Sequence, residues 1–296
     1  MQLEEEIARD SFDAPETTNP LLSPTLAEDR RAIVQLDPDH PGFRDGAYRA
    51  RRNEIAAIAL THEPGTPVPD APYTKDEHEV WRVICDKLEP QHREHACAEY
   101  LECLRVLDLP RERIPQMREV SERVEAVSGF RLEPVAGLVT PRVFLESLAN
   151  GVFLSTQYIR HHSTPLYTPE PDVVHETLGH AVTLADERLA ELNRLVGKAV
   201  KRTTTAEALE RLARVYWFTI EFGVLRENGE VKAYGTGLVS SAGELTAMLQ
   251  AELRPLDLEA AARQDFDPTM FQPLLFCADS FDAMYDALKD FLIRWQ

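Results

Sequence analysis

Residues 216–224 form an almost wholly apolar run in which Glu221 is the one charged side chain. Burying a lone carboxylate is costly unless a positive charge meets it. His175 and His180 lie upstream, and two imidazoles that hold a divalent metal supply such a charge. Two histidines and one carboxylate leave open coordination positions, which suits non-haem Fe(II) and oxygen chemistry. The sequence therefore predicts a metal centre built from these three residues. The alternative is two surface histidines and a carboxylate on a helix face.

The spacing of the two histidines constrains the backbone between them. In the zinc-peptidase pattern two histidines stand four residues apart and project from one helix face. Five residues of regular α-helix turn the side chain by roughly 140°. His175 and His180 therefore converge only if the segment departs from a regular helix, or if one histidine stands at its end. Gly179 is expected to supply the backbone freedom for that departure.

The composition is that of an ordinary globular protein. The 296 residues are 44% hydrophobic and 28% charged, within the normal range for such chains. The formal charge of −18 argues against nucleic acid or an anionic membrane as a partner. The sequence has no apolar run long enough to span a membrane, and its acidic N-terminus is unlike a secretory signal. Four cysteines without CxxC spacing indicate buried, reduced thiols, so we expect a cytoplasmic protein.

The first 34 residues differ from the rest of the chain. Residues 1–34 are acidic, contain prolines among Ser, Thr and Asn, and show little periodicity. We expect them to form a flexible leader, too short for a regulatory domain. Residues 35–296 are expected to form one catalytic domain. Because the chain stops soon after its last amphipathic segment, a monomer or dimer is expected.

Hydrophobic periodicity predicts a mainly α-helical fold with short β-hairpins. Apolar residues recur at helical spacing in five segments, 81–88, 117–127, 189–199, 209–220 and 281–295. Thr140 and Pro141 predict the cap and the first residue of a further helix. Residues 225–234 predict a hairpin with a type I′ turn at Asn228 and Gly229.

Several motifs give the chain a family likeness over about four-fifths of its length. They include DHPGF at 39–43, YRARR at 48–52, TQYIRH at 156–161, YTPEPD at 167–172 and WFTIEFG at 217–223, with further matches at 129–132, 134–138, 232–235 and 237–241. In order and spacing they resemble the pterin-dependent aromatic amino acid hydroxylases, most closely the catalytic domain of phenylalanine hydroxylase. The resemblance implies a single-domain catalytic fold that binds Fe(II) and a tetrahydropterin such as tetrahydrobiopterin.

The resemblance also implies roles around the metal. His175, His180 and Glu221 match the family's iron ligands. Glu176 and Tyr216 are expected at the catalytic centre, Glu176 as the acid near the pterin. The pterin itself is expected to contact four residues, Gly137, Leu138, Val139 and Phe144, the last by ring stacking.

A metal-bound histidine usually donates its second N–H to a carboxylate or carbonyl. Asp172 is a candidate for that partner of His175, and a helix-capping aspartate is the alternative.

For the substrate, the resemblance points to Arg160 and Trp217. A free amino acid needs its carboxylate met by a planar two-donor group, which a guanidinium provides. Arg160 is implied in that role, with Thr168 and Ser240 assisting, and a surface ion pair is the alternative. Trp217 falls on the same helical stripe as Glu221, so its indole is expected to line an aromatic pocket. Plain core packing is the alternative for Trp217.

The implied reaction is hydroxylation of the ring of a free aromatic amino acid, with O2 and the tetrahydropterin as co-substrates. We expect L-phenylalanine to be converted to tyrosine. Tryptophan hydroxylase, tyrosine hydroxylase and phenylalanine 3-hydroxylase remain alternatives within the family. Trp217 favours phenylalanine over tryptophan. Cys277 stands where tyrosine hydroxylases tend to have an Asp, which weakens the tyrosine hypothesis. A zinc-dependent hydrolase built on His175 and His180 is the alternative from another class.

Overall fold

The computed structural model describes residue 36 and residues 38–295. The leader expected at 1–34 lies outside these residues. The described part of the chain begins with α2 (Gly46–Thr61), α3 (Lys75–His95), α4 (Ala98–Leu107) and α5 (Met117–Ser128). A capping box between Thr74 and Glu77 starts α3. This helix buries Trp81, Ile84 and Leu88 on one face, as the spacing predicted.

Two short parallel strands and the helix between them position the loop 135–140. β1 (Arg131–Pro134) pairs with β2 (Val152–Ser155), and α6 (Pro141–Leu148) lies in the crossover between them. Thr140 caps α6 by accepting a hydrogen bond from the Val143 N–H, and Pro141 is the first helical residue, as predicted. The loop 135–140 is therefore fixed at both ends, by a strand and by a capped helix.

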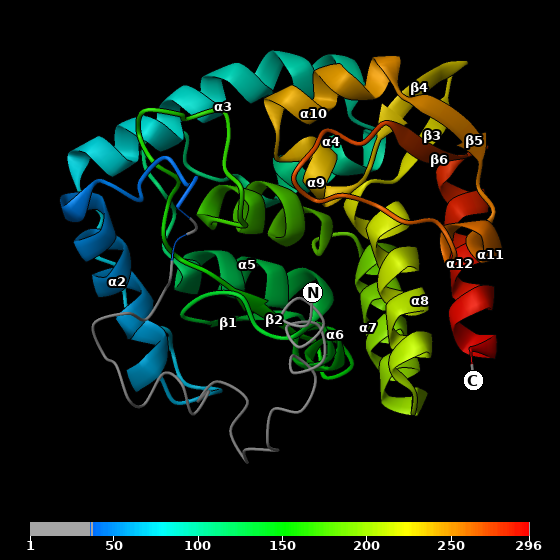
Figure 1. The fold of residues 1–296 in the computed structure, drawn as a ribbon, viewed down its shortest axis with the longest axis horizontal. Coiled ribbons are helices and arrows are strands. Elements are labelled where there is room, and N and C mark those ends of the chain that lie inside the picture. The colour runs from blue at the N-terminus through cyan, green and yellow to red at the C-terminus, as the bar shows by residue number, and fades with distance from the viewer. Residues whose placement is uncertain (1–35, 37, 296) are drawn as a thin grey trace, which may run out of the picture.

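Three helices stand side by side on the opposite side of the molecule from α2 (Figure 1). They are α7 (Glu187–Arg202), α8 (Ala206–Tyr216) and α12 (Phe281–Arg294). Each begins at a side-chain cap, from Asp186, Thr205 and Ser280 respectively. The predicted helix 209–220 is confirmed in position but not in regularity, because α8 ends at Tyr216 and the π-helix η2 (Trp217–Glu221) continues it.

The C-terminal part of the chain contains a four-stranded sheet with strand order β4-β3-β6-β5. β3 (Val224–Glu227) and β4 (Glu230–Ala233) form the predicted hairpin. Asn228 and Gly229 have φ angles of 53° and 85°, as a type I′ turn requires. β6 (Leu274–Ala278) runs parallel to both β3 and β5 (Glu252–Pro255), so the sheet is mixed rather than built from hairpins alone. Short helices join these strands: α9 (Thr236–Val239), α10 (Ala242–Ala247), η3 (Met248–Gln250) and α11 (Leu258–Ala261).

A second π-helix, η1 (His175–Ala181), lies in the middle of the molecule, between α2 on one side and α7 and α8 on the other (Figure 1). Its residues 176–181 are buried. One hydrophobic cluster runs from Val68 to Trp295 and includes Leu178 of η1. The described residues therefore share one main core, and η1 passes through it.

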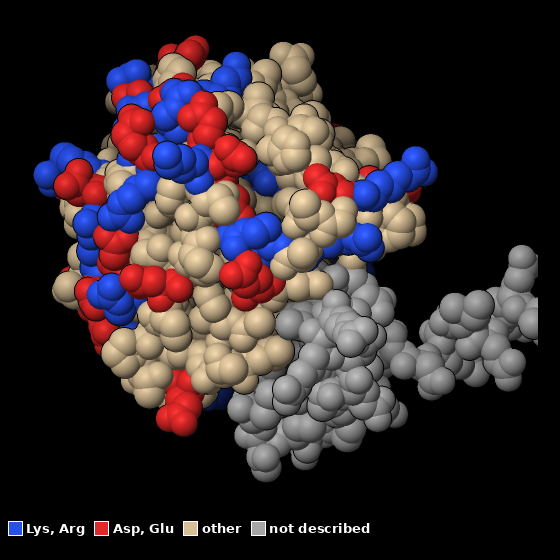
Figure 2. Space-filling view, turned by 90° about the vertical axis from the view of Figure 1, so that its left-hand side faces the viewer, with Lys and Arg blue, Asp and Glu red and all other residues tan. Residues whose placement is uncertain are grey.

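The surface on the α2 side carries charges of both signs. Figure 2 shows basic and acidic side chains interspersed there, without a large patch of one sign on this face. Arg51 of α2 pairs with Glu77 of α3, and Arg82 pairs with Asp86 along α3. The net charge of −18 is therefore not concentrated on this face.

All four cysteines lie in the described part of the chain and are free thiols; Cys97, Cys103 and Cys277 are buried and Cys85 is partly buried. Among the described helices, none combines the length and the apolar character needed to cross a bilayer.

Candidate metal centre and cavity

The two π-helices bring the predicted metal ligands together. In a π-helix each hydrogen bond spans five residues, so side chains five positions apart lie above one another. His175 and His180 are five apart in η1, and their Nε2 atoms lie 3.0 Å from each other. Glu221 ends η2, with one carboxylate oxygen 3.1 Å from His180 Nε2 and the other 3.7 Å from His175 Nε2. The expectation that this segment departs from a regular α-helix is confirmed.

The reason given for Gly179 was wrong. Its φ angle is not positive, so no special backbone conformation requires glycine there. A Cβ atom at this position would lie 2.9 Å from the Thr236 carbonyl oxygen. Gly179 therefore permits close approach of η1 to α9, and this approach brings Thr236 and Ser240 to the metal centre.

Two hydroxyl groups of the α9 region orient the ligands. The Ser240 hydroxyl donates to the Thr236 carbonyl at 2.7 Å, so it must accept from His175 Nδ1, which lies 3.0 Å away. That hydrogen bond places the proton on Nδ1 and leaves the Nε2 lone pair free for a metal. The Thr236 hydroxyl donates to Glu221 Oε2 at 2.7 Å.

Asp172 takes the second of the two roles expected for it. It accepts a hydrogen bond from the backbone N–H of His175 at 3.3 Å, as a helix-capping residue does. Its main partner is Arg160, whose Nε and Nη2 donate to the two carboxylate oxygens at 2.8 and 2.7 Å. Burial opposes ionisation of Asp172, but the charge of Arg160 outweighs burial and lowers the pKa. Ser240, not Asp172, orients the ring of His175.

Glu221 and His175 are in protonation states that suit a cation, whereas the site favours the protonated form of His180, whose proton a metal would displace. Burial opposes the charge of Glu221, but His180, His175 and the Thr236 hydroxyl outweigh it and lower its pKa to about 2. Burial and the neighbouring His180 lower the pKa of His175 to about 4, so its ring is neutral at pH 7. Burial opposes protonation of His180, and the charge of Glu221 outweighs burial and raises that pKa. A neutral imidazole and an anionic carboxylate are already in the forms that a divalent metal binds.

A cavity of about 310 Å³ opens from the three ligands. Most of the residues predicted for pterin and substrate line it: Gly137, Leu138, Val139, Phe144, Glu176, Tyr216 and Trp217. Trp217 and Glu221 line it together, as their shared helical stripe predicted. The alternative of surface histidines is wrong, since the side chain of His180 is only 3% exposed.

Three predicted residues are not among those that line this cavity: Arg160, Thr168 and Ser240. Ser240 lies behind His175, as described above. The Thr168 hydroxyl donates to the backbone carbonyl of Glu170 at 3.0 Å. Arg160 borders a separate hollow of about 60 Å³ between α2, α3 and the irregular segment 158–162. Cys277 is buried in β6 opposite Val224 and does not line the cavity either.

The polar atoms inside the cavity fit an organic ligand as well as a metal. Thr156 donates to Glu176 Oε1 through its backbone N–H at 3.3 Å and its hydroxyl at 3.2 Å. Burial raises the pKa of Glu176 to about 7. The Tyr216 hydroxyl is buried and has no hydrogen-bond partner among the described residues. An unpartnered buried hydroxyl in a cavity wall is a group that a ligand can satisfy.

Sequence reasoning missed several residues of the site. Those that line the cavity without having been predicted are Val135, Pro141, Leu145, Leu154, Thr156, Pro171, Ala213 and Phe266. Thr156 and Pro171 stand inside the TQYIRH and YTPEPD motifs, which could have indicated them. Phe266 lies in an irregular segment between α11 and β6, where no periodic pattern identifies it.

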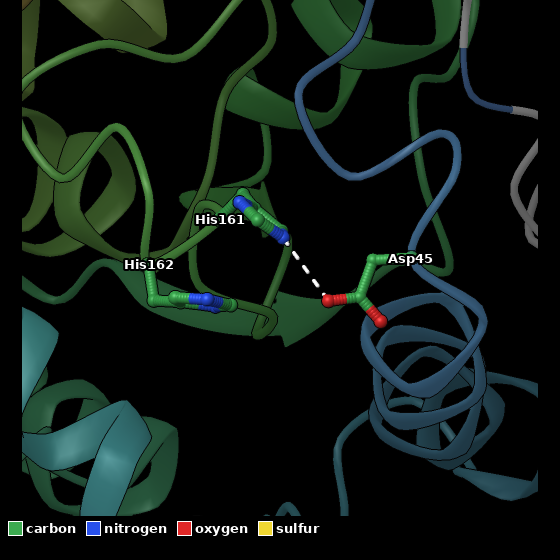
Figure 3. Close-up of side chains that lie close together, drawn as sticks. All are labelled: Asp45, His161 and His162. Atoms are coloured by element: carbon green, nitrogen blue, oxygen red, sulfur yellow. Dashed lines mark hydrogen bonds and ion pairs between the residues drawn. The ribbon is translucent and has the colours of Figure 1, made fainter.

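A second cluster of potential metal ligands lies at the start of α2, where Asp45, His161 and His162 meet (Figure 3). Asp45 Oδ1 accepts from the backbone N–H groups of Ala47 and Tyr48 and so caps α2. Its other oxygen lies 3.3 Å from His161 Nε2. The rings of His161 and His162 are tilted by 34°, with centroids 4.2 Å apart. Through the contact between Asp45 and His161, this cluster fastens segment 158–162 to α2.

The chain matches the sequence profile of the biopterin-dependent aromatic amino acid hydroxylases over residues 29–296. Phenylalanine 3-hydroxylase of Streptomyces coeruleorubidus is 46% identical over 252 residues, which are 85% of this chain and 90% of that protein. Phenylalanine-4-hydroxylase of Bos taurus is 43% identical over 264 residues, and tyrosine 3-monooxygenase of Mus musculus 44% over 267. The matches cover 87% and 88% of this chain but only 58% and 53% of those two mammalian proteins.

Solved structures of phenylalanine hydroxylases have the same fold. The Chromobacterium violaceum enzyme with bound iron(III) and 7,8-dihydrobiopterin matches with a TM-score of 0.73 and 30% identity, over 80% of this chain and 89% of that one. The enzyme from Legionella pneumophila matches with a TM-score of 0.69 and 33% identity, over 76% and 90%. Sequence, fold and the His–His–Glu centre agree, and the chain belongs to the biopterin-dependent aromatic amino acid hydroxylase family.

Proposed function

We propose that the protein is a monooxygenase that hydroxylates the ring of free L-phenylalanine with O2, Fe(II) and a tetrahydropterin such as tetrahydrobiopterin. The observation that carries this proposal is the convergence of His175, His180 and Glu221 on the wall of an aromatic-lined cavity. At about 310 Å³ the cavity is large enough for small ligands of this kind. The family match and the fold overturn the zinc-hydrolase alternative.

The three ligands would hold iron through the Nε2 atoms of the histidines and the Glu221 carboxylate. Three protein ligands leave coordination positions open, as oxygen chemistry requires. Iron and tetrahydropterin, when bound, supply the electrons and the oxygen activation for hydroxylation. The chain's part is to fix the donors. Ser240 keeps His175 Nε2 unprotonated, and Thr236 holds the Glu221 carboxylate in one orientation.

The pterin site is proposed on the opposite wall, along the loop 137–139. The backbone donors and acceptors of this loop can pair with the polar edge of a flat bicyclic ring. Phe144 lies edge-on to Tyr216, with ring centroids 6.0 Å apart, and offers a face for stacking. The Tyr216 hydroxyl and the Glu176 carboxyl provide hydrogen-bonding groups at the inner end.

For the substrate we propose that Trp217 lines the pocket around the ring and that Arg160 binds the carboxylate. Thr168 and Ser240 are proposed to assist by holding neighbouring groups in place, because their hydroxyl protons are donated to the carbonyls of Glu170 and Thr236. Asp172 already occupies the Nε and Nη2 edge of Arg160. A guanidinium has five N–H donors, so the Nη1 edge is left for a second carboxylate. Asp172 would then hold the guanidinium in place while that free edge binds the amino acid.

Hydroxylation at the meta position is the second candidate. It is favoured by the likeness to the Streptomyces phenylalanine 3-hydroxylase, which the chain matches over nearly that protein's whole length. Product analysis separates the two. The protein is loaded anaerobically with Fe(II) and supplied with a tetrahydropterin, O2 and phenylalanine, tyrosine or tryptophan. We expect para-tyrosine from phenylalanine; meta-tyrosine would establish the 3-hydroxylase, and pterin oxidation without any hydroxylated amino acid would contradict the proposal.

We propose further that the protein acts in the cytoplasm. The four free thiols support a reducing compartment. The strongly negative net charge disfavours nucleic acid and anionic membranes as partners. A monomer or dimer remains the predicted state of assembly.

A further inference from the structure

The irregular segment 262–273, between α11 and β6, contributes one residue to the wall of the cavity. Phe266 of this segment lines the cavity and is 36% exposed, so it stands at the boundary between cavity and solvent. Its ring lies nearly parallel to the Trp217 indole, with an interplanar angle of 13° and centroids 4.1 Å apart. It also meets Phe218 edge-on at 6.2 Å. Phe266 thus extends the wall that Trp217 begins.

The indole of Trp217 is fixed by a single buried amide. Its Nε1–H donates to Gln272 Oε1 at 3.0 Å, and Gln272 is only 4% exposed. The Nε2 group of Gln272 donates to the carbonyls of Asp267 and Met270, at 3.0 and 2.9 Å. The amide therefore faces a donor with its oxygen and two acceptors with its nitrogen, and a flipped amide would lose all three hydrogen bonds.

Gln272 consequently joins two parts of the wall. One end of its amide holds the indole, and the other end holds the backbone of 267–270, just beyond Phe266. Trp217 is in ring contact with Phe222 as well, at 4.5 Å and 36°. With Phe222 and Phe266 against its ring and Gln272 on its N–H, the indole has little freedom to turn.

We propose that Phe266 is a specificity-determining residue that forms the outer wall of the pocket for the substrate ring. Gln272 is a positioning residue that fixes Phe266 and Trp217 relative to each other. The inference rests on the proposed function, in which Trp217 walls the aromatic substrate. It predicts that ring selectivity and ring position depend on a loop residue that is not itself a metal ligand.

The chain offers matched controls for both residues. Phe271 belongs to the same segment, is 55% exposed and does not line the cavity, so Phe271→Ala is the control for Phe266→Ala. Gln264 also belongs to the segment and contacts Arg254 and Asp265 rather than Trp217, so Gln264→Met is the control for Gln272→Met. Phe266→Tyr keeps the ring and should restore wild-type behaviour.

The test compares steady-state product formation for phenylalanine and tryptophan in the Fe(II)-loaded enzyme at saturating tetrahydropterin. Phe266→Ala should raise the KM for phenylalanine roughly 2- to 10-fold, which corresponds to the binding free energy of one aromatic ring pair. It should shift the kcat/KM ratio towards tryptophan by about 10-fold. The KM for the pterin should stay within about 2-fold. Gln272→Met, which leaves the buried indole N–H unpaired, should lower kcat/KM for phenylalanine about 5-fold or more.

A second measurement needs no turnover. Because Phe266 covers the Trp217 indole, Phe266→Ala should shift the Trp217 fluorescence to longer wavelength in the metal-free protein, and Phe271→Ala should not. The Trp217 contribution is obtained by subtracting the spectrum of Trp217→Phe, and thermal unfolding checks that each variant is folded.

Two results would overturn the inference. One is an active wild-type enzyme whose amino acid KM and substrate ratio are the same in Phe266→Ala and Phe271→Ala. The other is a change in the pterin KM alone, which would make Phe266 part of the pterin wall. A wild-type protein that forms no hydroxylated amino acid would instead overturn the proposed function itself, and the specificity role with it.

Discussion

The Ser240 hydroxyl lies 3.0 Å from Nδ1 of His175 and gives its own proton to a backbone carbonyl, so it can only accept from the imidazole. This one contact fixes the tautomer of a metal ligand from the end of α9, 65 residues further along the chain. Close approach of α9 to η1 makes it possible, and Gly179 permits that approach.

Removing this hydroxyl should weaken the metal site without removing a ligand. We predict that Ser240→Ala lowers Fe(II) affinity about 10- to 100-fold, the usual effect of losing a hydrogen bond to a metal-bound histidine. Anaerobic Fe(II) titration measures it. Ser163→Ala is the matched control, because Ser163 bonds the ring of His161 outside the metal centre. Equal affinities for the two variants would show that Ser240 does not act through His175.

Arg160 should matter to the amino acid more than to the pterin. The planar guanidinium of arginine binds Asp172 with one edge and leaves a second edge for the substrate. Lysine keeps the positive charge but has no such planar group. Arg160→Lys should therefore raise the amino acid KM about 10-fold or more, on the scale of a lost bidentate contact, while the pterin KM changes much less. Product-based kinetics decide this, with Arg51→Lys as a control on the neighbouring surface. An unchanged amino acid KM would assign Arg160 to structure alone.

The indole of Trp217 should discriminate between substrate rings. A smaller ring at this position enlarges the pocket, and each missing group changes discrimination by about 1–3 kcal/mol. Trp217→Phe should raise kcat/KM for tryptophan relative to phenylalanine by roughly 10-fold. Trp81, whose indole N–H donates to the Pro110 carbonyl far from the cavity, provides the control Trp81→Phe. The assay must follow hydroxylated product at saturating pterin; a ratio that stays constant would place Trp217 in the core only.

Stability should depend on pH through Glu244, which lies away from the metal. Burial raises the pKa of Glu244 to about 7 from an ordinary value of 4.5. The folded state then holds this proton to higher pH than the unfolded chain, so the group's contribution to stability falls as pH rises through that interval. Glu244→Gln stays neutral at every pH. Relative to the wild type, its free energy of unfolding should therefore rise between pH 4.5 and about 7, by up to roughly 3 kcal/mol. Urea unfolding at several pH values measures the difference. A stability difference between Glu244→Gln and the wild type that does not change with pH would contradict the prediction.

Much of the metal centre could be predicted because its chemistry leaves a mark in the sequence. A lone acid in an apolar run and two histidines at a spacing that no regular helix can use both point to a shared cation. The helices with clear periodicity were also predictable, as α3, α7 and α12 show.

The supporting contacts could not be predicted, because they depend on how separate elements pack. Thr236 and Ser240 reach the ligands through the approach of α9 to η1, and Phe266 reaches Trp217 along an irregular segment. Neither relationship has a periodic signal. The π-helical form of η1 and η2 likewise follows from tertiary contacts that the spacing alone only permits.

Metal analysis of the anaerobically purified, Fe(II)-loaded protein tests the central claim most directly. The wild type should bind about one iron per chain at the two-histidine, one-carboxylate centre. His175→Ala, His180→Ala and Glu221→Ala should each lose tight iron binding and turnover, whereas His161→Ala, in the cluster at α2, should retain both. Stoichiometric iron with near-normal hydroxylation in any of the first three variants would remove that residue from the ligand set and contradict the account.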